Sequence, residues 1–522
     1  MQASLRSPVP GRARAGLRRR ALGALLIALG AAACSGESPT PAGKPAPEPE
    51  VEPLGRAPVV LVLFDALHAG HVTHLGYERE TTPNLDRLAA EGVSFAHAIA
   101  PAPYTLASIP SILTGRRPDT HGVTNINAVL VDAERTLAER LADAGYRTVA
   151  AVGNLNGSAK MGDAQGFEVF DELFRAPTPE QATKIGADGT PLRRPTADMF
   201  VDFTREQVAV DDARPLFLYL HVFEPHAPYL MPAEYRSLWL DPDYDGPLAS
   251  GEVRDLMDTV EGKVTAGPDD VAAAIALYDA NLRWADHNLG ELRRVLEDAG
   301  LWDRALVIVT SDHGEAFWQH GQWGHNDHLF DEQVNVPLVV KLPAGADPEH
   351  PRGPRGPRGP RGPRGLVRED LVSTLDLVPS ICQWLDLPLD GPPMDGRSLA
   401  ALVEHGDWSP PGDRELILRS NRPLAAFALR TPTTKTILQR GPRNRWHDTQ
   451  RVRRYSLVDD PGEEHDLYAE QRAAADAIVE RLEQWGEAAV VRRRELGRGM
   501  SPDELNMLQQ LGYVDGDEES EE

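Results

Sequence analysis

Cysteine and positive charge are both scarce in this chain. Cys34 and Cys382 are its only cysteines among 522 residues, so a framework of disulfides is excluded. Its 54 lysines and arginines stand against 79 aspartates and glutamates, which gives a formal net charge of −25 at pH 7. Because nucleic acids are bound by basic surfaces, this balance argues against a nucleic-acid partner. It does not exclude small anionic substrates, since a bound metal ion can invert the local potential.

The one long apolar run of the chain, ALGALLIALGAAA, lies close to the N-terminus at residues 21–33. A basic segment that ends in three arginines precedes it, and Cys34 follows it directly. A basic segment, a short apolar run and small residues before the cut predict a signal peptide over residues 1–33. Residues 34–57 are rich in proline, glutamate and alanine, which predicts an extended tether.

The end of this predicted signal, from Ala31 to Cys34, resembles a bacterial lipobox. The resemblance implies acylation of Cys34, attachment to outer-membrane lipid, and a location at the outer membrane, in the periplasm or on the cell surface. A plain signal peptide that releases the protein is the alternative. If Cys34 carries lipid, Cys382 is left without a partner and is predicted to be an inert buried thiol.

From residue 58 onward, short apolar runs alternate with amphipathic segments, which predicts a layered α/β fold for residues 58–410. Buried strands are predicted at residues 58–65, 147–154, 215–223, 306–310 and 337–343. Thr81 or Thr82 is expected to cap a helix that begins at Pro83. Further helices are expected from Thr136 and around an apolar stripe at residues 275–296.

Three later segments have distinct compositions. Five Pro-Arg-Gly triplets at residues 351–365 predict a solvated surface loop. Residues 411–475 contain four short strand-like runs, the last at residues 455–460, and predict a small antiparallel subdomain. A helix is expected at roughly residues 471–494, packed on the main domain. Residues 476–522 are assigned to most of this helix and to an acidic tail that is expected to be disordered.

Polar residues stand at the ends of three predicted strands. Asp65 ends the first strand, Asp312 and His313 follow the fourth, and His226 lies in the segment EPHAPY after the third. In open α/β sheets the ligand site lies at these carboxyl ends. A carboxylate beside an imidazole is typical of a divalent metal site, so Asp65, Asp312 and His313 are expected to bind metal.

A hydroxyl-rich segment, YTLASIPSILTG, supplies a candidate nucleophile, Thr105. Carboxylates from separate strands beside a hydroxyl could hold a metal that lowers the pKa of the hydroxyl and neutralises an oxyanion. Two simpler interpretations stay open at this point. Thr105 could cap a helix, and His226 could pack between the two prolines that flank it.

Eight segments occur in a characteristic order along nearly the whole mature chain. They are LVLFDALHAGHV, TTPNLDRLAAEGVSF, YTLASIPSILTGRRPDTHGV, TLAERLADAGYRTVAAV, HVFEPHAPY, YDANLRWADHNLGEL, VIVTSDHGE and GHNDHLFDEQVNVPLVVKLP. In this order they resemble the motifs of the sulfatase-like branch of the alkaline phosphatase and sulfatase superfamily. The resemblance implies an alkaline-phosphatase-like three-layer α/β/α sandwich, with a small C-terminal α+β subdomain and a metal site at the strand ends.

The resemblance also assigns roles to individual residues. It implies metal ligands at Asp65, Thr105, Asp312 and His313, with Thr105 as the nucleophile. His226 and His325 match histidines that bind the substrate oxyanion, protonate the leaving group or hold a second metal. Glu315 is expected to orient His313. Three further histidines are expected to support the ligands from outside the site or to lie on the surface: His71, His320 and His328. No role is assigned to Glu224 or Asp331.

Some positions depart from the sulfatase pattern. Thr105 stands where sulfatases carry the cysteine or serine that matures to formylglycine. Threonine there instead resembles the phosphatases, phosphodiesterases and phosphoethanolamine transferases of the superfamily. Ile109 replaces the arginine of the usual motif, and Ala66 replaces the second acid of an Asp-Asp pair. With His313 as a nitrogen ligand, zinc or manganese is favoured over calcium.

The expected function is a secreted, metal-dependent hydrolase in which Thr105 attacks a phosphate mono- or diester, so the partner is an anionic ester. One alternative is a sulfuric ester hydrolase. Another is a phosphoethanolamine-type head-group transferase, against which the lack of membrane-spanning helices before the catalytic domain counts. An alternative of another class is a non-catalytic surface binding protein that retains the fold.

Overall fold

The computed structural model describes residues 48–125, 128–178, 184–185, 191–251, 265–326, 328–344, 363–410, 414–420, 426–440 and 450–491. Four predicted features lie outside these residues: the signal peptide, Cys34 with most of its tether, residues 351–362 of the Pro-Arg-Gly repeat, and the acidic tail. Among the helices described, none is both long and apolar enough to cross a membrane.

An eight-stranded sheet with the order β12-β2-β11-β8-β1-β7-β3-β4 forms the centre of the main domain. Its strands are β1 (Val59–Asp65), β2 (Val93–Ile99), β3 (Arg147–Val152), β4 (Val169–Glu172), β7 (Leu216–Pro225), β8 (Leu306–Ser311), β11 (Asn335–Lys341) and β12 (Leu366–Ser373). β1 pairs in parallel with β7 and β8, whereas β11 is antiparallel to both of its neighbours. Because β8, β1, β7 and β3 run in one direction, their carboxyl ends meet at the same edge.

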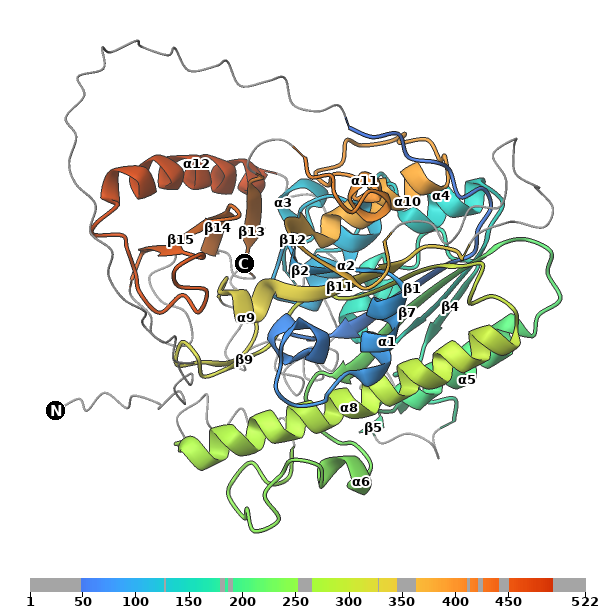
Figure 1. Cartoon of the computed structure of the whole chain (residues 1–522), viewed down its shortest axis with the longest axis horizontal. Coiled ribbons are helices and arrows are strands. Elements are labelled where there is room, and N and C mark those ends of the chain that lie inside the picture. The colour runs from blue at the N-terminus through green and yellow to red at the C-terminus, as the bar shows by residue number, and fades with distance from the viewer. Residues whose placement is uncertain are drawn as a thin grey trace, which may run out of the picture. The chain divides into compact units, whose positions relative to one another are not determined.

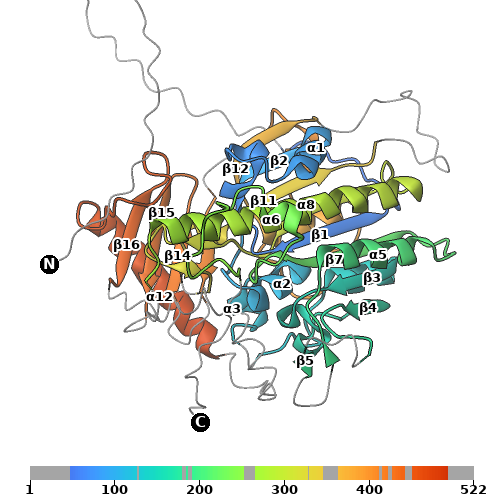
Figure 2. The same ribbon diagram turned by 90° about the horizontal axis from the view of Figure 1, so that it is seen from below.

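Helices cover both faces of this sheet and give three layers (Figure 1). One face carries α1 (Pro83–Glu91), α5 (Ala197–Val208) and α8 (Pro268–Asp298), and Figure 2 shows α5 and α8 side by side. The other face carries α2 (Thr105–Thr114), α4 (Leu137–Asp143), α10 (Leu377–Trp384) and α11 (Ala400–Glu404). Every residue of β1 is buried between these layers, which explains its unbroken apolar run. The predicted α/β/α sandwich is confirmed.

A separate antiparallel sheet, with the order β13-β14-β15-β16, forms the expected C-terminal subdomain. Its elements are β13 (Leu416–Arg419), β14 (Ala426–Arg430), β15 (Thr434–Gln439), β16 (Val452–Ser456) and α12 (Arg472–Val491), which packs on the sheet. The expected last strand at residues 455–460 is wrong in its bounds. Residues after Ser456 form a turn instead, because the carboxylates of Asp459 and Asp460 bind hydroxyl and amide groups within it.

The remaining described elements are short. They are η1 (Ala69–His71), η2 (Thr73–Leu75), α3 (Pro118–His121), η3 (Leu155–Gly157), η4 (Ala159–Met161), β5 (Lys184–Ile185), β6 (Pro191–Leu192), α6 (Ala233–Arg236), β9 (Ala316–Phe317), β10 (Trp323–Gly324), α9 (Asp331–Val334) and η6 (Thr374–Asp376).

Candidate active site

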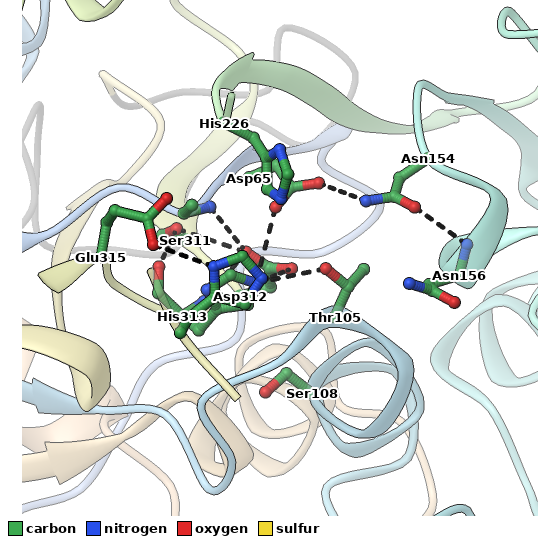
Figure 3. A network of polar contacts seen from close by, with 12 residues as sticks. Asp65, Thr105, Ser108, Asn154, Asn156, His226, Ser311, Asp312, His313 and Glu315 are labelled. Carbon is green, nitrogen blue, oxygen red and sulfur yellow. Dashed lines mark hydrogen bonds and ion pairs between the residues drawn. The ribbon is translucent and has the colours of Figure 1, made fainter. Parts of the chain in front are cut away.

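Two neighbouring strands bring the predicted metal ligands together. Asp65 is the last residue of β1, and Asp312 and His313 directly follow β8. All three side chains are fully buried, and one donor atom from each lies within 4.8 Å of the others. Nε2 of His313 is 3.5 Å from a carboxylate oxygen of Asp65 and 3.5 Å from one of Asp312 (Figure 3). The three residues therefore form one group, and their binding of a metal stays a prediction.

Backbone amides fix the orientation of Asp312. Its Oδ1 accepts hydrogen bonds from the amides of Ala66 and His313, at 3.2 and 2.9 Å. Position 66, where the resemblance expects a second acid, thus supports the site through its backbone. Oδ2 of Asp312 has no hydrogen-bond partner among the described residues and faces the imidazoles of His313 and His221. Burial tends to raise the pKa of Asp312, but these two imidazoles outweigh it and hold the pKa below its usual range.

Local contacts at the end of β8 hold the two strand ends in register. The hydroxyl of Ser311 donates to the carbonyl of Phe64 at 2.6 Å and accepts from the amide of Leu67 at 2.8 Å. A Cβ on Gly314 would lie 2.3 Å from a backbone carbonyl of α9, so a side chain does not fit there. Nδ1 of His313 lies 2.9 Å from the carbonyl of Gly314, which turns Nε2 toward the carboxylates.

Thr105 is the first residue of α2, and its hydroxyl lies 3.2 Å from Nε2 of His313. Tyr104, not Thr105, holds the N-cap position of this helix. The positive end of the helix dipole, which favours negative charge, lies at the same place. Ser108 lies about one turn further along α2 (Figure 3). Its hydroxyl donates to the carbonyl of Ala102 at 2.9 Å. Thr105 therefore lies beside the two carboxylates and the imidazole, whereas the hydroxyl of Ser108 is bonded to the segment that precedes the helix.

A row of three imidazoles borders the carboxylates. The ring centroid of His325 is 4.3 Å from that of His313 and 5.1 Å from that of His226. Nδ1 of His226 lies against the carbonyl of Ala227. Burial, assisted by the neighbouring His325, lowers the pKa of His226 to about 3, so this ring is neutral at physiological pH. The structure thus brings both predicted histidines, His226 and His325, to the site.

The expected pairing of Glu315 with His313 is corrected by the structure. Nδ1 of His313 faces the Gly314 carbonyl, so the position for an orienting group on this ring is already occupied. The carboxylate of Glu315 instead lies 2.9 Å from Nδ1 of His325. Glu315 therefore orients the second imidazole of the row.

Two polar side chains of the site are missing from the sequence predictions. Asn154, just after β3, donates its amide to Oδ2 of Asp65 at 2.6 Å (Figure 3). A polar residue directly after a buried strand is the same signal that identifies Asp65, and it could have found Asn154. His221 lies inside β7, and its Nε2 is 3.7 Å from carboxylate oxygens of both Asp65 and Asp312. Its signal is a lone histidine within the apolar run LFLYLHVF.

The other polar residues singled out in the sequence have structural surroundings. His71 pairs with Asp279 at 2.7 Å, His320 with Glu332 at 2.6 Å, and Asp331 with Arg430 at 2.9 Å. His328 is buried close to α9. Glu224 is buried in β7, where burial raises its pKa to about 7. Cys382 is buried in α10 as expected, and burial raises the pKa of its thiol to about 11.

The donor set of the site fits a divalent cation. Two carboxylates and one imidazole, all shielded from solvent, offer donor atoms close enough together for one ion. Oδ2 of Asp312 is a buried carboxylate oxygen without a hydrogen bond from the described residues, which a cation would satisfy.

Comparison with known proteins identifies the family of the chain. The family model described as Sulfatase matches residues 58–387, which is more than half of the chain. The multifunctional alkaline phosphatase superfamily protein PehA of Trinickia caryophylli is 25% identical over 428 residues, covering 68% of this chain and 79% of PehA. An arylsulfatase of Clostridium perfringens is 23% identical over 393 residues, covering 66% of this chain and 78% of that protein.

Solved structures show the same fold. The phosphonate monoester hydrolase of Agrobacterium radiobacter is similar with a TM-score of 0.61 and 19% identity, over 83% of this chain and 96% of that one. A 2-O GAG sulfatase is similar with a TM-score of 0.62 and 18% identity, over 88% and 97% of the two chains. The family match shows that the chain belongs to the sulfatase family and, with the two curated relatives, that it is a hydrolase of the alkaline phosphatase superfamily.

Proposed function

We propose that this protein is a metal-dependent hydrolase of phosphate mono- or diesters, with Thr105 as its nucleophile. One observation carries the proposal: the Thr105 hydroxyl lies 3.2 Å from His313, within a fully buried site that also contains Asp65 and Asp312. Formylglycine, with which sulfatases attack their esters, forms from cysteine or serine and not from threonine. A threonine alkoxide can attack phosphorus directly, so residue 105 favours phosphate over sulfate.

Asp65, Asp312 and His313 would hold one divalent cation, with zinc or manganese preferred, and Thr105 would adjoin it. The bound cation would lower the pKa of the hydroxyl and neutralise charge on the ester oxygens. The Thr105 oxygen then forms a bond to phosphorus while the bond from phosphorus to the leaving alcohol breaks. Water hydrolyses the resulting phosphothreonine and releases phosphate from a monoester, or the remaining phosphate monoester from a diester. The N-terminus of α2 stabilises the negative charge that develops beside Thr105.

The histidine row supports two different tasks. Because Nδ1 of the neutral His226 faces a carbonyl, Nε2 of this ring presents a lone pair, which suits a proton acceptor or the ligand of a second cation. His325 has its Nδ1 on the carboxylate of Glu315, which stabilises positive charge on the ring. We assign His325 to protonation of the leaving alcohol.

We also propose that the protein is exported and anchored to the outer membrane through an acylated Cys34. The basic segment, the apolar run and the lipobox-like residues 31–34 support this location. The proline-rich segment that follows Cys34 would let the hydrolase reach anionic esters away from the lipid surface.

The nature of the ester is tested with p-nitrophenyl phosphate, bis-p-nitrophenyl phosphate and p-nitrophenyl sulfate. The purified protein is first freed of metal and then supplied with zinc, manganese or calcium. We expect turnover of one or both phosphates with zinc or manganese, and little with calcium. Turnover of the sulfate alone would contradict the proposal.

The role of Thr105 is tested by Thr105→Ala and Thr105→Ser, with Ser108→Ala as the matched control on the same helix. We expect Thr105→Ala to lower kcat by at least about 1,000-fold, because the attacking atom is removed. Thr105→Ser retains a hydroxyl and should retain part of the rate, and Ser108→Ala should leave the rate unchanged. Wild-type turnover by Thr105→Ala would disprove the nucleophile assignment.

A second candidate function is hydrolysis of sulfuric esters. The family match and the arylsulfatase relative favour it, and it would require the threonine to act without maturation to formylglycine. The same substrate panel separates the two candidates. Transfer of the phosphoryl group to an added alcohol instead of water, measured by product analysis, would indicate a head-group transferase.

A further inference from the structure

We propose that His221 is a positioning residue that sets the affinity of the site for its metal ion, an inference that rests on the proposed metal-dependent function. His221 touches both carboxylates that would bind the metal, yet it lies behind them, within the sheet. Its role would be to hold these carboxylates in the arrangement that the cation requires.

Strand register explains how a residue inside β7 reaches the site. β7 lies next to β1, and His221 pairs with Leu63, two residues before Asp65. Because side chains two residues apart in a strand point to the same face, Leu63 and Asp65 share a face of β1. An imidazole beside Leu63 therefore lies one step behind Asp65, toward the interior.

The ring of His221 faces both carboxylates of the proposed metal site. Its side chain is fully buried, and its Nε2 is 3.7 Å from Oδ2 of Asp65 and 3.7 Å from Oδ2 of Asp312. Neither ring nitrogen has a hydrogen-bond partner among the described residues. A buried imidazole without hydrogen bonds destabilises a fold unless another interaction compensates for it. Here the compensating interaction is electrostatic and is made to both carboxylates at once.

The position of His221 reduces the repulsion between the two carboxylates of the proposed metal site. Asp65 and Asp312 offer oxygens within 4.8 Å of each other, so the two carboxylates repel before a cation arrives. An imidazole N–H edge facing both oxygens reduces that repulsion and fixes their positions. His221 lies outside the set of residues whose donor atoms are all within 4.8 Å of one another, which favours a positioning role over direct ligation.

The loop after β3 confines the imidazole from the other side. A Cβ on Gly157, in η3, would lie 3.1 Å from Nδ1 of His221, so the backbone of this loop lies directly against the ring. Asn154, at the start of the same loop, donates to the oxygen of Asp65 that also faces His221. One short loop thus holds both the imidazole and the carboxylate that it contacts.

The experiment measures metal affinity, independently of turnover. The full chain is freed of metal, and binding of Zn²⁺ or Mn²⁺ is measured by competition with a chelating dye. We expect His221→Phe to bind either ion about 10- to 100-fold more weakly than wild type, as is typical when a group that orients metal ligands is lost. His221→Gln keeps an N–H donor and should lose less. The matched control is Phe217→Leu, at a buried residue on the same face of the same strand, which should keep wild-type affinity.

Absorption of bound Co²⁺ distinguishes positioning from ligation. If His221 positions the carboxylates, the spectrum of the His221→Phe complex keeps the shape of the wild-type spectrum. Wild-type affinity in a folded His221→Phe, or a spectrum that shows the loss of a nitrogen ligand, would overturn the positioning role. If His221→Phe does not fold by circular dichroism, His221→Gln is judged by the same two criteria. Failure of the wild type to bind any of these ions would instead overturn the proposed metal-dependent function.

Discussion

At the scale of single residues, one ionisable group is buried in the interior of this protein away from the candidate active site. Asp163, in the loop after η4, is fully buried, and neither of its oxygens has a hydrogen-bond partner among the described residues. Burial raises its pKa well above the ordinary value of 3.8. The folded protein therefore holds this proton more tightly than the unfolded chain does.

Asp163→Asn should change the pH dependence of stability. Because the folded-state pKa of Asp163 is raised, the free energy of unfolding of the wild type falls as pH rises above about 4 through that pKa. Asparagine stays neutral, so we expect Asp163→Asn to be more stable than wild type at pH 8, by roughly 1–3 kcal/mol, and to differ little at pH 4. Urea unfolding at both pH values measures this, with the exposed Asp211→Asn as control. A constant difference between Asp163→Asn and wild type across this range would contradict the explanation.

Individual site residues were predictable where they end an apolar run. Asp65, Asp312 and His313 stand at such ends, and the parallel direction of their strands brings them together without knowledge of the full topology. The partner of Glu315 was not predictable, because it depends on how the turn after Gly314 directs two side chains in space. His221 was missed because it lies inside its strand, and its contact with Asp65 depends on the register between β7 and β1.

At the scale of elements, the start of α1 illustrates a cap supplied by another helix. Thr82 occupies the N-cap position as predicted, but its side chain does not bond to the first-turn amides. The carboxylate of Asp286, in α8, instead accepts from the amides of Asn84 and Leu85, at 2.9 and 2.8 Å. Packing of the two helices thus depends on a buried cap as well as on apolar contacts.

Asp286→Ala should destabilise the protein by roughly 1–2 kcal/mol, because it leaves helix amides buried without acceptors. Asp298→Ala, at the exposed end of the same helix, is the matched control and should have little effect. Urea unfolding curves of the two variants at pH 8 provide the comparison. Equal stability of Asp286→Ala and wild type would show that the amides of α1 find other partners.

The sequence did not predict strand β12 or the direction of strand β11, and each omission has a structural reason. β12 lies at the edge of the sheet and includes Arg368 and Asp370, so its pattern lacks the continuous apolar run of a central strand. The antiparallel direction of β11 was also not predictable. Its run of apolar residues indicates only that both faces of the strand are buried. The direction of β11 depends on its pairing with β8 and with β2, which lies far away in the sequence.

At the scale of the whole molecule, the C-terminal sheet is tied to the segment that carries His325. Lys435, in β15, is fully buried and pairs with Asp331 at 2.6 Å and with Glu463 at 2.8 Å. Asp331 begins α9, six residues after His325. Because removal of one partner from a buried ion group is strongly destabilising, the C-terminal subdomain supports the order of the site as well as its own fold.

The predicted lipid anchor concerns the location of the whole protein. In a bacterial host, the wild type should be found in the membrane fraction and incorporate labelled palmitate, because acylation at Cys34 would attach it to lipid. Cys34→Ser should lose the label and move to the soluble fraction, and Cys382→Ser, in the buried thiol of α10, should keep it. Recovery of unlabelled wild-type protein in the soluble fraction would contradict acylation and support a released protein.

The identity of residue 105 has a consequence for how many copies of the protein are active. A nucleophile that a separate enzyme must create is present only in the copies that this enzyme has processed. A threonine hydroxyl at the start of α2 is installed by the ribosome in every copy. With Thr105 as nucleophile, the active fraction of any preparation would be set by metal occupancy alone, and the protein would need no dedicated maturation partner in the host that produces it.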